Sequence, residues 1–351
     1  MNSPIPFFDG HNDTILRLYG PRSVHGGADL FFRESADGHI DLPRARAAGM
    51  KGGFWALYVP SPEGKDPLTL DTTNVPPSLT PGQPESLELT MHLAAGLFEL
   101  ERRSNGGFRV VRDVASLRKS IADDAYAAIF HIEGAEMISQ GLDELYVLHQ
   151  AGLRSIGPVW SRDNIFAHGV PFRFPSSPDT GPGLTDTGRD LVRACNELGI
   201  LIDLSHMNEK GFWDVAKLSD KPLVATHSNA HAVSASTRNL TDRQLEAVRE
   251  SGGVVGLNYA VGFLRPDGAR DSDTPLEVML RHTDHLLSKL GEDGVALGSD
   301  FDGAGIPDAI GDVTGVQKLL QAMLDHGYGR ELVDKIALNN WLAVLERTWV
   351  A

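Results

Sequence analysis

Histidines and carboxylates of the kind that bind divalent metals stand at the ends of several short apolar segments. The set is His11, Asp13, Glu133, His206, His227 and Asp300. His11 and Asp13 are two residues apart, so in a strand they face the same side. That pair alone is more typical of a capping aspartate beside a hydrogen-bonded histidine. The whole set predicts a metal site with five ligands and one further carboxylate, because charged groups there are costly to bury without a partner.

Other polar residues near these positions are predicted to have different roles. His131 faces the same side as Glu133 but lies deeper, so we expect it to be a hydrogen-bonded core histidine. Glu136 lies beyond the strand in a loop, where we expect it to be solvated. Asp9 is in phase with His11, one layer below it, and is a candidate to orient a ligand histidine.

Arg162 and His168 follow the fourth apolar segment, and each has a sequence position from which it could face the site. For both we favour a place on the polar surface instead. Asp302 lies beyond Asp300 in the sequence Phe-Asp-Gly-Ala-Gly, which is typical of a turn.

Eight short apolar segments, most of them separated by helical patterns, must position these residues. The segments are Pro6–Gly10, Gly53–Val59, Tyr126–His131, Ser155–Trp160, Leu201–Ser205, Leu223–Thr226, Val254–Asn258 and Val295–Ser299. Several of them lack polar alternation, as expected of parallel strands that are covered on both faces. Amphipathic stretches between them predict helices, among them Glu85–Arg103, Thr187–Leu198, Thr241–Ser251 and Thr274–Leu290.

This alternation predicts a single-domain (β/α)8 TIM barrel over residues 1–351. The carboxyl ends of all strands in such a barrel meet at one face, whatever their separation in sequence. An open doubly wound sheet is the alternative, but the glycine-rich dinucleotide fingerprint that often marks it is missing. We interpret Val313–His326 and Gly329–Trp349 as closing helices of the same domain.

Three segments are too long to be tight connections between a strand and a helix. They cover residues 21–39, 60–84 and 166–183, and they are rich in proline, glycine, serine, threonine or charged residues. Each follows a predicted strand, so we expect all three to lie over the active-site face of the barrel.

The composition argues against several classes of function. The formal net charge of -15 is unfavourable for nucleic acid or an anionic membrane as the main partner. Cys195 is the single cysteine, so neither an intrachain disulfide nor a cysteine-based zinc cluster is available. The sequence shows no signal-peptide pattern and no apolar run that is long enough for a membrane span. A cytoplasmic location without a membrane anchor is therefore the default expectation.

Seven motifs, in order along the chain, resemble the renal (membrane) dipeptidase family of zinc dipeptidases. They are Asp9–Asp13, His131–Gly134, Ile202–His206, Thr226–Ser228, Thr237–Asp242, Gly298–Gly303 and Leu338–Glu346. The resemblance covers nearly the whole chain, and the opening His-x-Asp differs from the His-x-His of a generic amidohydrolase. The family is a branch of the amidohydrolase superfamily, so the resemblance implies a TIM barrel of the metal-dependent hydrolase type.

The resemblance also implies two divalent metal ions per chain, with zinc as the favoured metal. The implied ligands are His11 and Asp13 for the first ion, His206 and His227 for the second, and Glu133 between the two. Manganese, cobalt and iron can occupy similar sites, so the ligand types do not fix the metal. Two neighbouring cations can lower the pKa of a shared water toward neutrality, which suits hydrolysis.

Three further positions carry implied roles in catalysis or substrate binding. Asp300 matches the family's catalytic carboxylate, and Arg238 matches the arginine that binds the substrate's terminal carboxylate. An arginine offers a planar fork of donors that fits a carboxylate. Trp160 stands where the mammalian enzymes have a histidine that is thought to contact the substrate. Tryptophan has one N–H donor and cannot titrate, so either Trp160 donates to the substrate or His168 takes that role.

We therefore expect a binuclear metallo-dipeptidase that acts on dipeptides with a free C-terminal carboxylate. Family resemblance extends this expectation to D residues at the second position, and dimers are common in the family. The departure at Trp160 motivates an alternative, an amidohydrolase acting on a non-peptide amide, an N-acyl amino acid or a lactone. A protein that binds metal without turnover is disfavoured, because such a site needs no spare carboxylate like Asp300.

Overall fold

The computed structural model describes residues 3–23, 27–62 and 80–349. Its strands are β1 (Phe7–Asn12), β2 (Met50–Tyr58), β3 (Phe108–Val110), β4 (Tyr126–Glu133), β5 (Leu153–Gly157), β6 (Leu201–Ile202), β7 (Val224–Ala225), β8 (Val254–Asn258) and β9 (Val295–Gly298). All eight predicted strands are confirmed, although their ends differ by a few residues. Only β3 is absent from the prediction, because three residues are too few to show a pattern.

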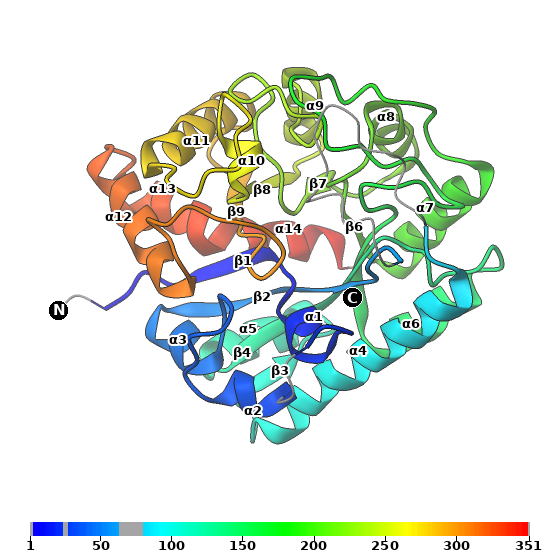
Figure 1. Ribbon diagram of the computed structural model, residues 1–351, viewed down its shortest axis with the longest axis horizontal. Helices are drawn as coiled ribbons and strands as arrows, with labels where there is room; N and C mark the ends of the chain where they lie inside the picture. The colour runs from blue at the N-terminus through cyan, green and yellow to red at the C-terminus, as the bar shows by residue number, and fades with distance from the viewer. Residues whose placement is uncertain (1–2, 24–26, 63–79, 350–351) are drawn as a thin grey trace.

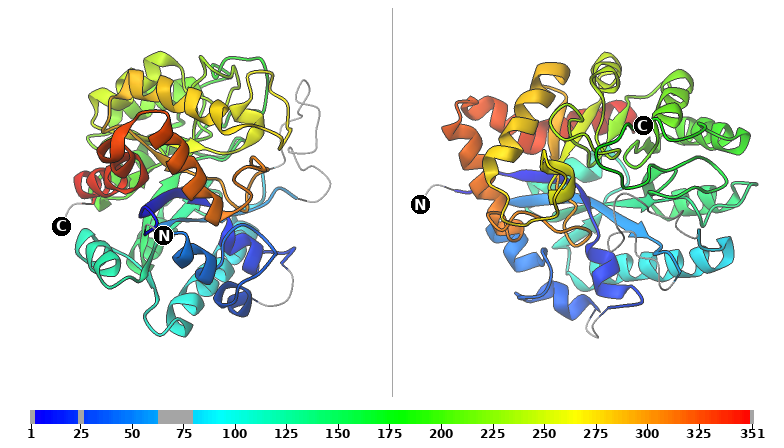
Figure 2. Two further views of the ribbon diagram at one scale, coloured as in Figure 1. Left: turned by 90° about the vertical axis from the view of Figure 1, so that its left-hand side faces the viewer. Right: turned by 45° about the horizontal axis from the view of Figure 1, so that its top comes forward.

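The strands pair in parallel throughout the described chain. One sheet has the order β1-β2-β4-β5-β6, with β3 paired to the start of β4, and the other has the order β7-β8-β9. Single bridges join the two sheets at both edges, between Asp203 and Val224 and between Asn12 and Phe301. The strands therefore close into the predicted barrel, with helices around it (Figure 1 and Figure 2).

Helices follow most of the strands. They are α1 (Thr14–Tyr19), α2 (Gly27–Phe32), α3 (Leu42–Ala47), α4 (Gln83–Arg103), α5 (Val114–Ala122), α6 (Asp143–Ala151), α7 (Asp186–Leu198), α8 (Glu209–Leu218), α9 (Asp242–Glu250), α10 (Val261–Leu264), α11 (Leu276–Leu290), α12 (Val316–Asp325), α13 (Gly329–Asp334) and α14 (Asn340–Thr348). The four helices predicted between strands correspond to α4, α7, α9 and α11, and the first closing helix corresponds to α12. The second closing helix is interrupted, because a π-helical turn at Lys335–Asn339 separates α13 from α14.

The last helix packs against the strands below the site. Trp341 of α14 belongs to one apolar cluster with strand residues that include Phe8, Phe54 and Ile129. The Trp341 and Phe54 rings lie 5.0 Å apart between centroids, and Trp341 Nε1 donates to the Leu297 carbonyl at 2.9 Å. Burial of such large apolar side chains stabilises a fold by roughly 1.5–3 kcal/mol each. The strand ends therefore project from a well-packed framework.

The long segments differ in part from the prediction. Residues 21–39 contain α2 and are not a loop alone, because Phe31 packs its ring against Trp55 and Phe108 at 5.3 and 5.4 Å between centroids. Residues 63–79 of the second segment lie outside the described residues. Residues 166–183, which are all described, contain no helix and no strand beyond a single bridge at Gly169.

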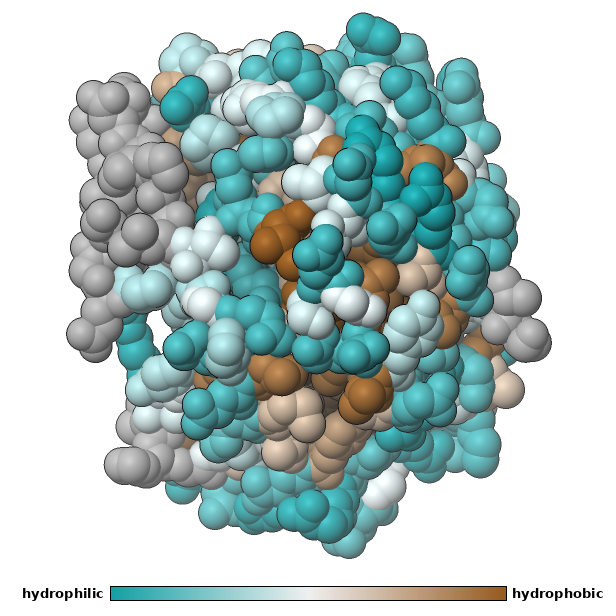
Figure 3. All heavy atoms as spheres, turned by 90° about the vertical axis from the view of Figure 1, so that its right-hand side faces the viewer, coloured by the Kyte–Doolittle hydropathy of each residue, from teal (hydrophilic) through white to brown (hydrophobic). Residues whose placement is uncertain are grey.

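The exposed surface of the described chain is largely polar. The face shown in Figure 3 is mostly hydrophilic, with smaller groups of hydrophobic side chains between. The exposed large hydrophobic side chains among the described residues are Met91, Tyr146, Val147 and Ile165. None of the described helices combines the length and apolarity that a membrane span requires.

Candidate metal centre and active site

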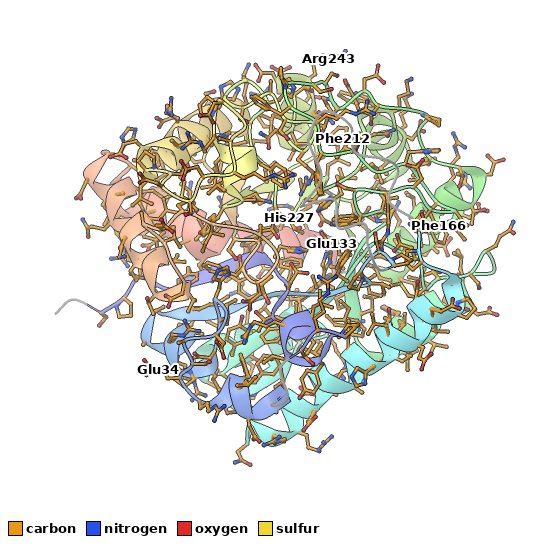
Figure 4. All side chains as sticks on the ribbon, viewed as in Figure 1. Glu34, Glu133, Phe166, Phe212, His227 and Arg243 are labelled. Carbon is orange, nitrogen blue, oxygen red and sulfur yellow. The ribbon has the colours of Figure 1, made fainter. Side chains whose placement is uncertain are left out.

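The carboxyl ends of the strands bring the six predicted metal-site and catalytic residues to one place. Glu133 is the last residue of β4, and His11 lies near the end of β1 with Asp13 just beyond it. The other three follow β6, β7 and β9 and are His206, His227 and Asp300. All six are less than one-tenth exposed. Figure 4 shows Glu133 and His227 side by side near the centre of the molecule, whereas Glu34 and Arg243 lie at its edge.

One carboxylate oxygen of Glu133 lies close to three imidazoles. Its Oε1 atom is 3.0 Å from Nε2 of His206, 3.4 Å from Nε2 of His227 and 3.7 Å from Nε2 of His11. The Nε2 atoms of His206 and His227 are only 3.0 Å apart. Both ring nitrogens of the fully buried His11 lack a hydrogen-bond partner among the described residues. Nitrogens and oxygens that converge in this way are arranged as metal ligands are.

Asp13 and Asp300 form a second group around His11. The Oδ2 atom of Asp13 lies 3.4 Å from Nε2 of His11, and a carboxylate oxygen of Asp300 lies within 4.8 Å of ligand atoms of both. Oδ2 of Asp300 accepts a hydrogen bond from Nδ2 of Asn258 at 3.0 Å. Asp300 and His206 have positive φ angles of 60° and 69°, a conformation that is rare outside glycine and that clusters at functional sites.

Burial and the nearby charges shift the pKa values of this cluster. Burial opposes protonation of His11, but the carboxylates of Glu133, Asp13 and Asp300 raise its pKa to about 10. Burial raises the pKa of Glu133 to about 8, and it lowers the pKa of the two other site histidines well below the ordinary value. The attraction between the carboxylates and the protonated imidazole therefore offsets the cost of burying these charges only in part. The donor set of imidazoles and carboxylates fits a divalent cation, and zinc suits it well.

Residues behind the histidines fix how the rings are oriented. Oγ of Ser161 lies 2.7 Å from Nδ1 of His206, and Oγ1 of Thr226 lies 2.8 Å from Nδ1 of His227. Asp203 accepts a hydrogen bond from Oγ1 of Thr226 at 2.6 Å, so a chain of contacts leads from Asp203 to His227. The sequence interpretation missed Asp203. Its signal is a carboxylate inside a predicted buried strand, where burial demands partners.

Arg238 lies beside these histidines with its side chain buried. Its Nη2 atom is 3.1 Å from Nε2 of His206 and donates to the carbonyl of His227 at 3.2 Å. Its guanidinium lies 5.3 Å from the centre of the Phe263 ring. Its Nε atom has no hydrogen-bond partner among the described residues. A buried guanidinium that still has a donor to offer is well suited to bind a carboxylate.

A cavity of about 720 Å³ opens next to the cluster. Its lining includes Asp13, Glu133, His206 and Asp300. Its lining also includes residues from each of the three long segments, namely Pro21, Arg22, Pro60, Ser61, Pro62 and Phe172. A cavity of this volume is of the size that holds small-molecule ligands.

Trp160 reaches this cavity, whereas His168 does not. Trp160 is among the lining residues, and its ring lies 5.7 Å from the ring of His206 between centroids. His168 is absent from the described residues that line the cavity, and its Nδ1 atom lies 2.9 Å from Oδ2 of Asp163. The structure therefore does not bring His168 to the site, because its imidazole pairs with a neighbouring carboxylate instead.

Two expectations about nearby charged residues are wrong. Glu136, expected to be solvated, is buried, and its Oε1 atom accepts from Nε of Arg162 at 2.8 Å. Arg162, expected on the polar surface, has a side chain with no solvent exposure. The attraction between the two charges and the further hydrogen bonds of Arg162 compensate for the water that the guanidinium loses on burial, whereas Oε2 of Glu136 has no hydrogen-bond partner among the described residues.

The expectations for Asp9 and His131 have opposite outcomes. Asp9 orients no histidine through a described hydrogen bond, because its carboxylate accepts from the backbone N–H and the hydroxyl of Ser299 at 2.7 and 2.9 Å. It ties β1 to the end of β9 instead. The prediction that His131 is a hydrogen-bonded core histidine is confirmed, since it is fully buried with Nδ1 2.9 Å from Oγ of Ser155.

Comparisons with known proteins agree with this geometry. A family model described as membrane dipeptidase (peptidase family M19) matches residues 1–350. The chain is 48% identical over 269 residues to an uncharacterized protein in the pqqA 5' region of Klebsiella pneumoniae, covering 77% of this chain and 98% of that protein.

Two solved structures are similar over almost the whole chain. One is the dipeptidase AC, a metallo peptidase of family M19, at 52% identity and a TM-score of 0.93, with 99% of each chain covered. The other is a metallo peptidase from Rhodobacter sphaeroides liganded with a phosphinate mimic of the dipeptide L-Ala-D-Ala. It is 51% identical, with a TM-score of 0.95, and 99% of this chain and 100% of that chain are covered. This chain therefore belongs to the membrane dipeptidase family, peptidase family M19, and is a metallo-dipeptidase.

Proposed function

We propose that this metallo-dipeptidase uses two divalent cations, most suitably zinc, to hydrolyse dipeptides that carry a free C-terminal carboxylate. The proposed ligands are His11, Asp13, His206 and His227, with Glu133 shared between the two ions. The observation that carries the proposal is the position of Oε1 of Glu133, which lies 3.0, 3.4 and 3.7 Å from three imidazole nitrogens. A carboxylate has two oxygens, so one residue can serve both ions.

We expect Asp300 of this chain to transfer the proton that moves from the attacking water to the leaving amine. Bound divalent cations lower the pKa of water and polarise a carbonyl oxygen. Asp300 accepts a proton from the attacking water as a general base and gives it to the leaving amine as a general acid. Asn258 holds the other side of this carboxylate through its hydrogen bond to Oδ2, which leaves Oδ1 for the proton.

Arg238 is proposed to bind the carboxylate of the second residue of the substrate. Its burial strengthens a charge-assisted hydrogen bond, and its Nε donor is not used by any described residue. A carboxylate held next to His206 places the adjoining peptide bond at the metal centre and restricts cleavage to very short peptides. The phosphinate mimic of L-Ala-D-Ala in the Rhodobacter sphaeroides enzyme supports a D residue at the second position.

One preparation tests the metal site and the substrate class together. We expect elemental analysis to find about two divalent ions per chain, as in other two-metal hydrolase sites. We expect L-Xaa-L-Xaa and L-Xaa-D-Xaa dipeptides to be cleaved, and this activity to disappear on chelation. Dipeptides amidated at the C-terminus should be cleaved far more slowly, since Arg238 then has no carboxylate to bind.

Other outcomes would contradict specific parts of the proposal. If no metal binds after zinc is supplied, the ligand assignment is wrong. If the ions bind but N-acyl amino acids or lactones are hydrolysed in place of dipeptides, the metal site stands and the substrate class changes. If amidated and free dipeptides are cleaved equally, Arg238 does not have the proposed role.

A further inference from the structure

A buried ion pair lies behind the wall of the cavity and takes no part in the proposed metal centre. Nε of Arg162 is 2.8 Å from Oε1 of Glu136, and the two side chains are 0% and 1% exposed. Removing two charges from water is unfavourable unless their donors and acceptors find good partners. The remaining contacts of Arg162 therefore show which neighbouring groups this ion pair holds in place.

The other donors of Arg162 reach the end of β2 and the residues just beyond it. Nη2 donates to the carbonyl of Val59 at 2.6 Å, and Nη1 donates to Oγ of Ser61 at 3.0 Å and to the hydroxyl oxygen of Tyr58 at 3.3 Å. The guanidinium carbon also lies 5.3 Å from the ring centre of Tyr58 and 5.4 Å from that of Trp160. One buried cation thus holds two aromatic side chains of the cavity wall.

Tyr58 is the member of this arrangement that offers a hydroxyl beside the proposed metal centre. It is paired in register with Glu133 across β2 and β4, and it lines the cavity together with Glu133 and Asp13. Burial raises the pKa of Tyr58 above its ordinary value, so the hydroxyl keeps its proton at neutral pH. The hydroxyl oxygen accepts from Arg162, and no described residue receives the hydroxyl proton in a hydrogen bond.

We propose that the Glu136–Arg162 pair positions Tyr58 to donate a hydrogen bond to the bound dipeptide at the reaction centre. The inference rests on the proposed function, because it concerns how the same cavity holds its substrate. Tyr58 contacts the substrate, and Arg162 is a positioning residue that acts through it. A hydroxyl that accepts from a cation also donates more strongly, because hydrogen bonds in a chain polarise one another.

This assignment bears on the position where the mammalian enzymes have a histidine. Trp160 fills that position, and its ring lies 5.1 Å from the ring of Tyr58 and 5.7 Å from that of His206 between centroids. The two aromatic rings form adjoining parts of one wall. Tyr58 supplies a donor at this wall from the end of β2, which is separated from β5, the strand before Trp160, by β4.

Replacement of Tyr58 by phenylalanine removes the donor and leaves the ring. We expect Tyr58→Phe to lower kcat/KM about 10- to 100-fold on a dipeptide that the wild-type chain cleaves, with unchanged metal content. Tyr126→Phe is the matched control, since Tyr126 is buried against Trp55 and Met50 and does not line the cavity. The kcat/KM of the Tyr126→Phe variant should stay within about twofold of the wild-type value.

A double-mutant cycle tests whether Arg162 acts through Tyr58. We expect Arg162→Gln to lower kcat/KM in the wild-type background but to add little in the Tyr58→Phe background, because the hydroxyl that it positions is already gone. Arg162→Lys keeps the positive charge and should retain more activity than Arg162→Gln. Arg44→Gln is the control for loss of an ion-paired arginine, since Arg44 pairs with Asp41 and Asp312 away from the cavity.

The contradicting outcomes are distinct. A Tyr58→Phe variant with kcat/KM within about twofold of the wild type overturns the donor role of Tyr58. Fully additive losses in the double variant overturn the positioning role of Arg162. If Arg162→Gln does not fold, Glu136→Gln provides the second arm of the same cycle. A wild-type chain that binds metal and cleaves no dipeptide overturns the proposed function itself, and this result is visible before any variant is made.

Discussion

Asp300 lines the cavity with one carboxylate oxygen held by Asn258. Replacement by asparagine keeps the size of the side chain and an acceptor for Asn258, but an amide cannot take up a proton near neutral pH. We expect Asp300→Asn to lower kcat about 10²- to 10⁴-fold while metal content stays at the wild-type value. Steady-state kinetics and elemental analysis of the same sample check this prediction.

Asp308 offers a control for that variant, because it is exposed and lies in the same connecting segment. Asp308→Asn should keep wild-type turnover. Near-normal turnover of Asp300→Asn with metal bound would show that another group transfers the proton.

Asp203 contacts the site indirectly, through the hydroxyl of Thr226. Its Oδ1 atom accepts from the backbone N–H groups of Ser205 and Thr226, and its Oδ2 atom accepts from the Thr226 hydroxyl that contacts His227. In Asp203→Asn one of these oxygens becomes an N–H group that faces a donor. We expect metal affinity to fall about 10- to 100-fold, measured by competition with a chromogenic chelator.

Asp41 is a matched control for this change, since it is another buried aspartate that accepts from backbone N–H groups, at Ser35 and Arg44. Asp41→Asn should reduce the free energy of unfolding without changing metal affinity. Equal metal affinity in Asp203→Asn and the wild type would show that the orientation of His227 does not depend on Asp203.

At the scale of elements, His282 joins α11 to the end of α10 and to the segment that follows β7. Its Nδ1 atom accepts from the backbone N–H of Ala230 at 3.2 Å, and its Nε2 atom lies 2.8 Å from the carbonyl of Leu264. Burial lowers the pKa of His282 to about 4, below the ordinary value of 6.5. A second ring proton would face the Ala230 N–H, so the folded chain holds this imidazole neutral.

The direction of the resulting pH dependence follows from that shift. Below pH 6.5 the unfolded chain takes up a proton at His282 that the folded chain refuses until about pH 4, so stability falls over this interval. The slope from this one group approaches roughly 1.4 kcal/mol per pH unit. We expect His282→Gln, which can accept and donate at the same places, to have a shallower decline. Urea unfolding at several pH values between 4 and 7.5 measures it, and identical slopes would contradict the assignment.

At the scale of the whole molecule, the proposed metal centre would join strand ends from opposite parts of the chain. Imidazole nitrogens of His11 in β1, His206 beyond β6 and His227 beyond β7 lie within 4 Å of Oε1 of Glu133 at the end of β4. A ligand that binds only the folded state stabilises it by about 2.7 kcal/mol at a hundred times its Kd. The unfolding entropy is roughly 2.1 cal/mol/K per residue, so for a chain of 351 residues we expect removal of metal to lower Tm by about 4 °C for each ion lost.

Differential scanning calorimetry before and after chelation checks the effect, with zinc added back as the control. Recovery of Tm on re-addition would separate metal loss from damage to the chain. An unchanged Tm after verified metal removal would contradict the proposal that the cations bind these buried strand ends.

Local patterns in the sequence determine the strands and most of the site. Uninterrupted apolar segments are a short-range signal, and all eight of them become strands. Glu133, His206 and Asp300 meet because parallel strands of a barrel present their carboxyl ends at one face, a rule that needs no knowledge of side-chain contacts. The position of polar residues just after apolar segments was therefore enough to bring this set together.

Only the tertiary structure decided whether charged residues with partners distant in the chain are buried or solvated. Arg162 is buried because Val59, 103 residues away, accepts its hydrogen bond, and Asp9 binds Ser299, 290 residues away. No local pattern reports such pairs. A charge is buried or solvated according to whether compensating groups reach it, and those groups are placed by the packing of the whole barrel. The wall that holds Tyr58 is therefore a property of the fold, whereas the residues of the proposed metal site can already be recognised in the sequence.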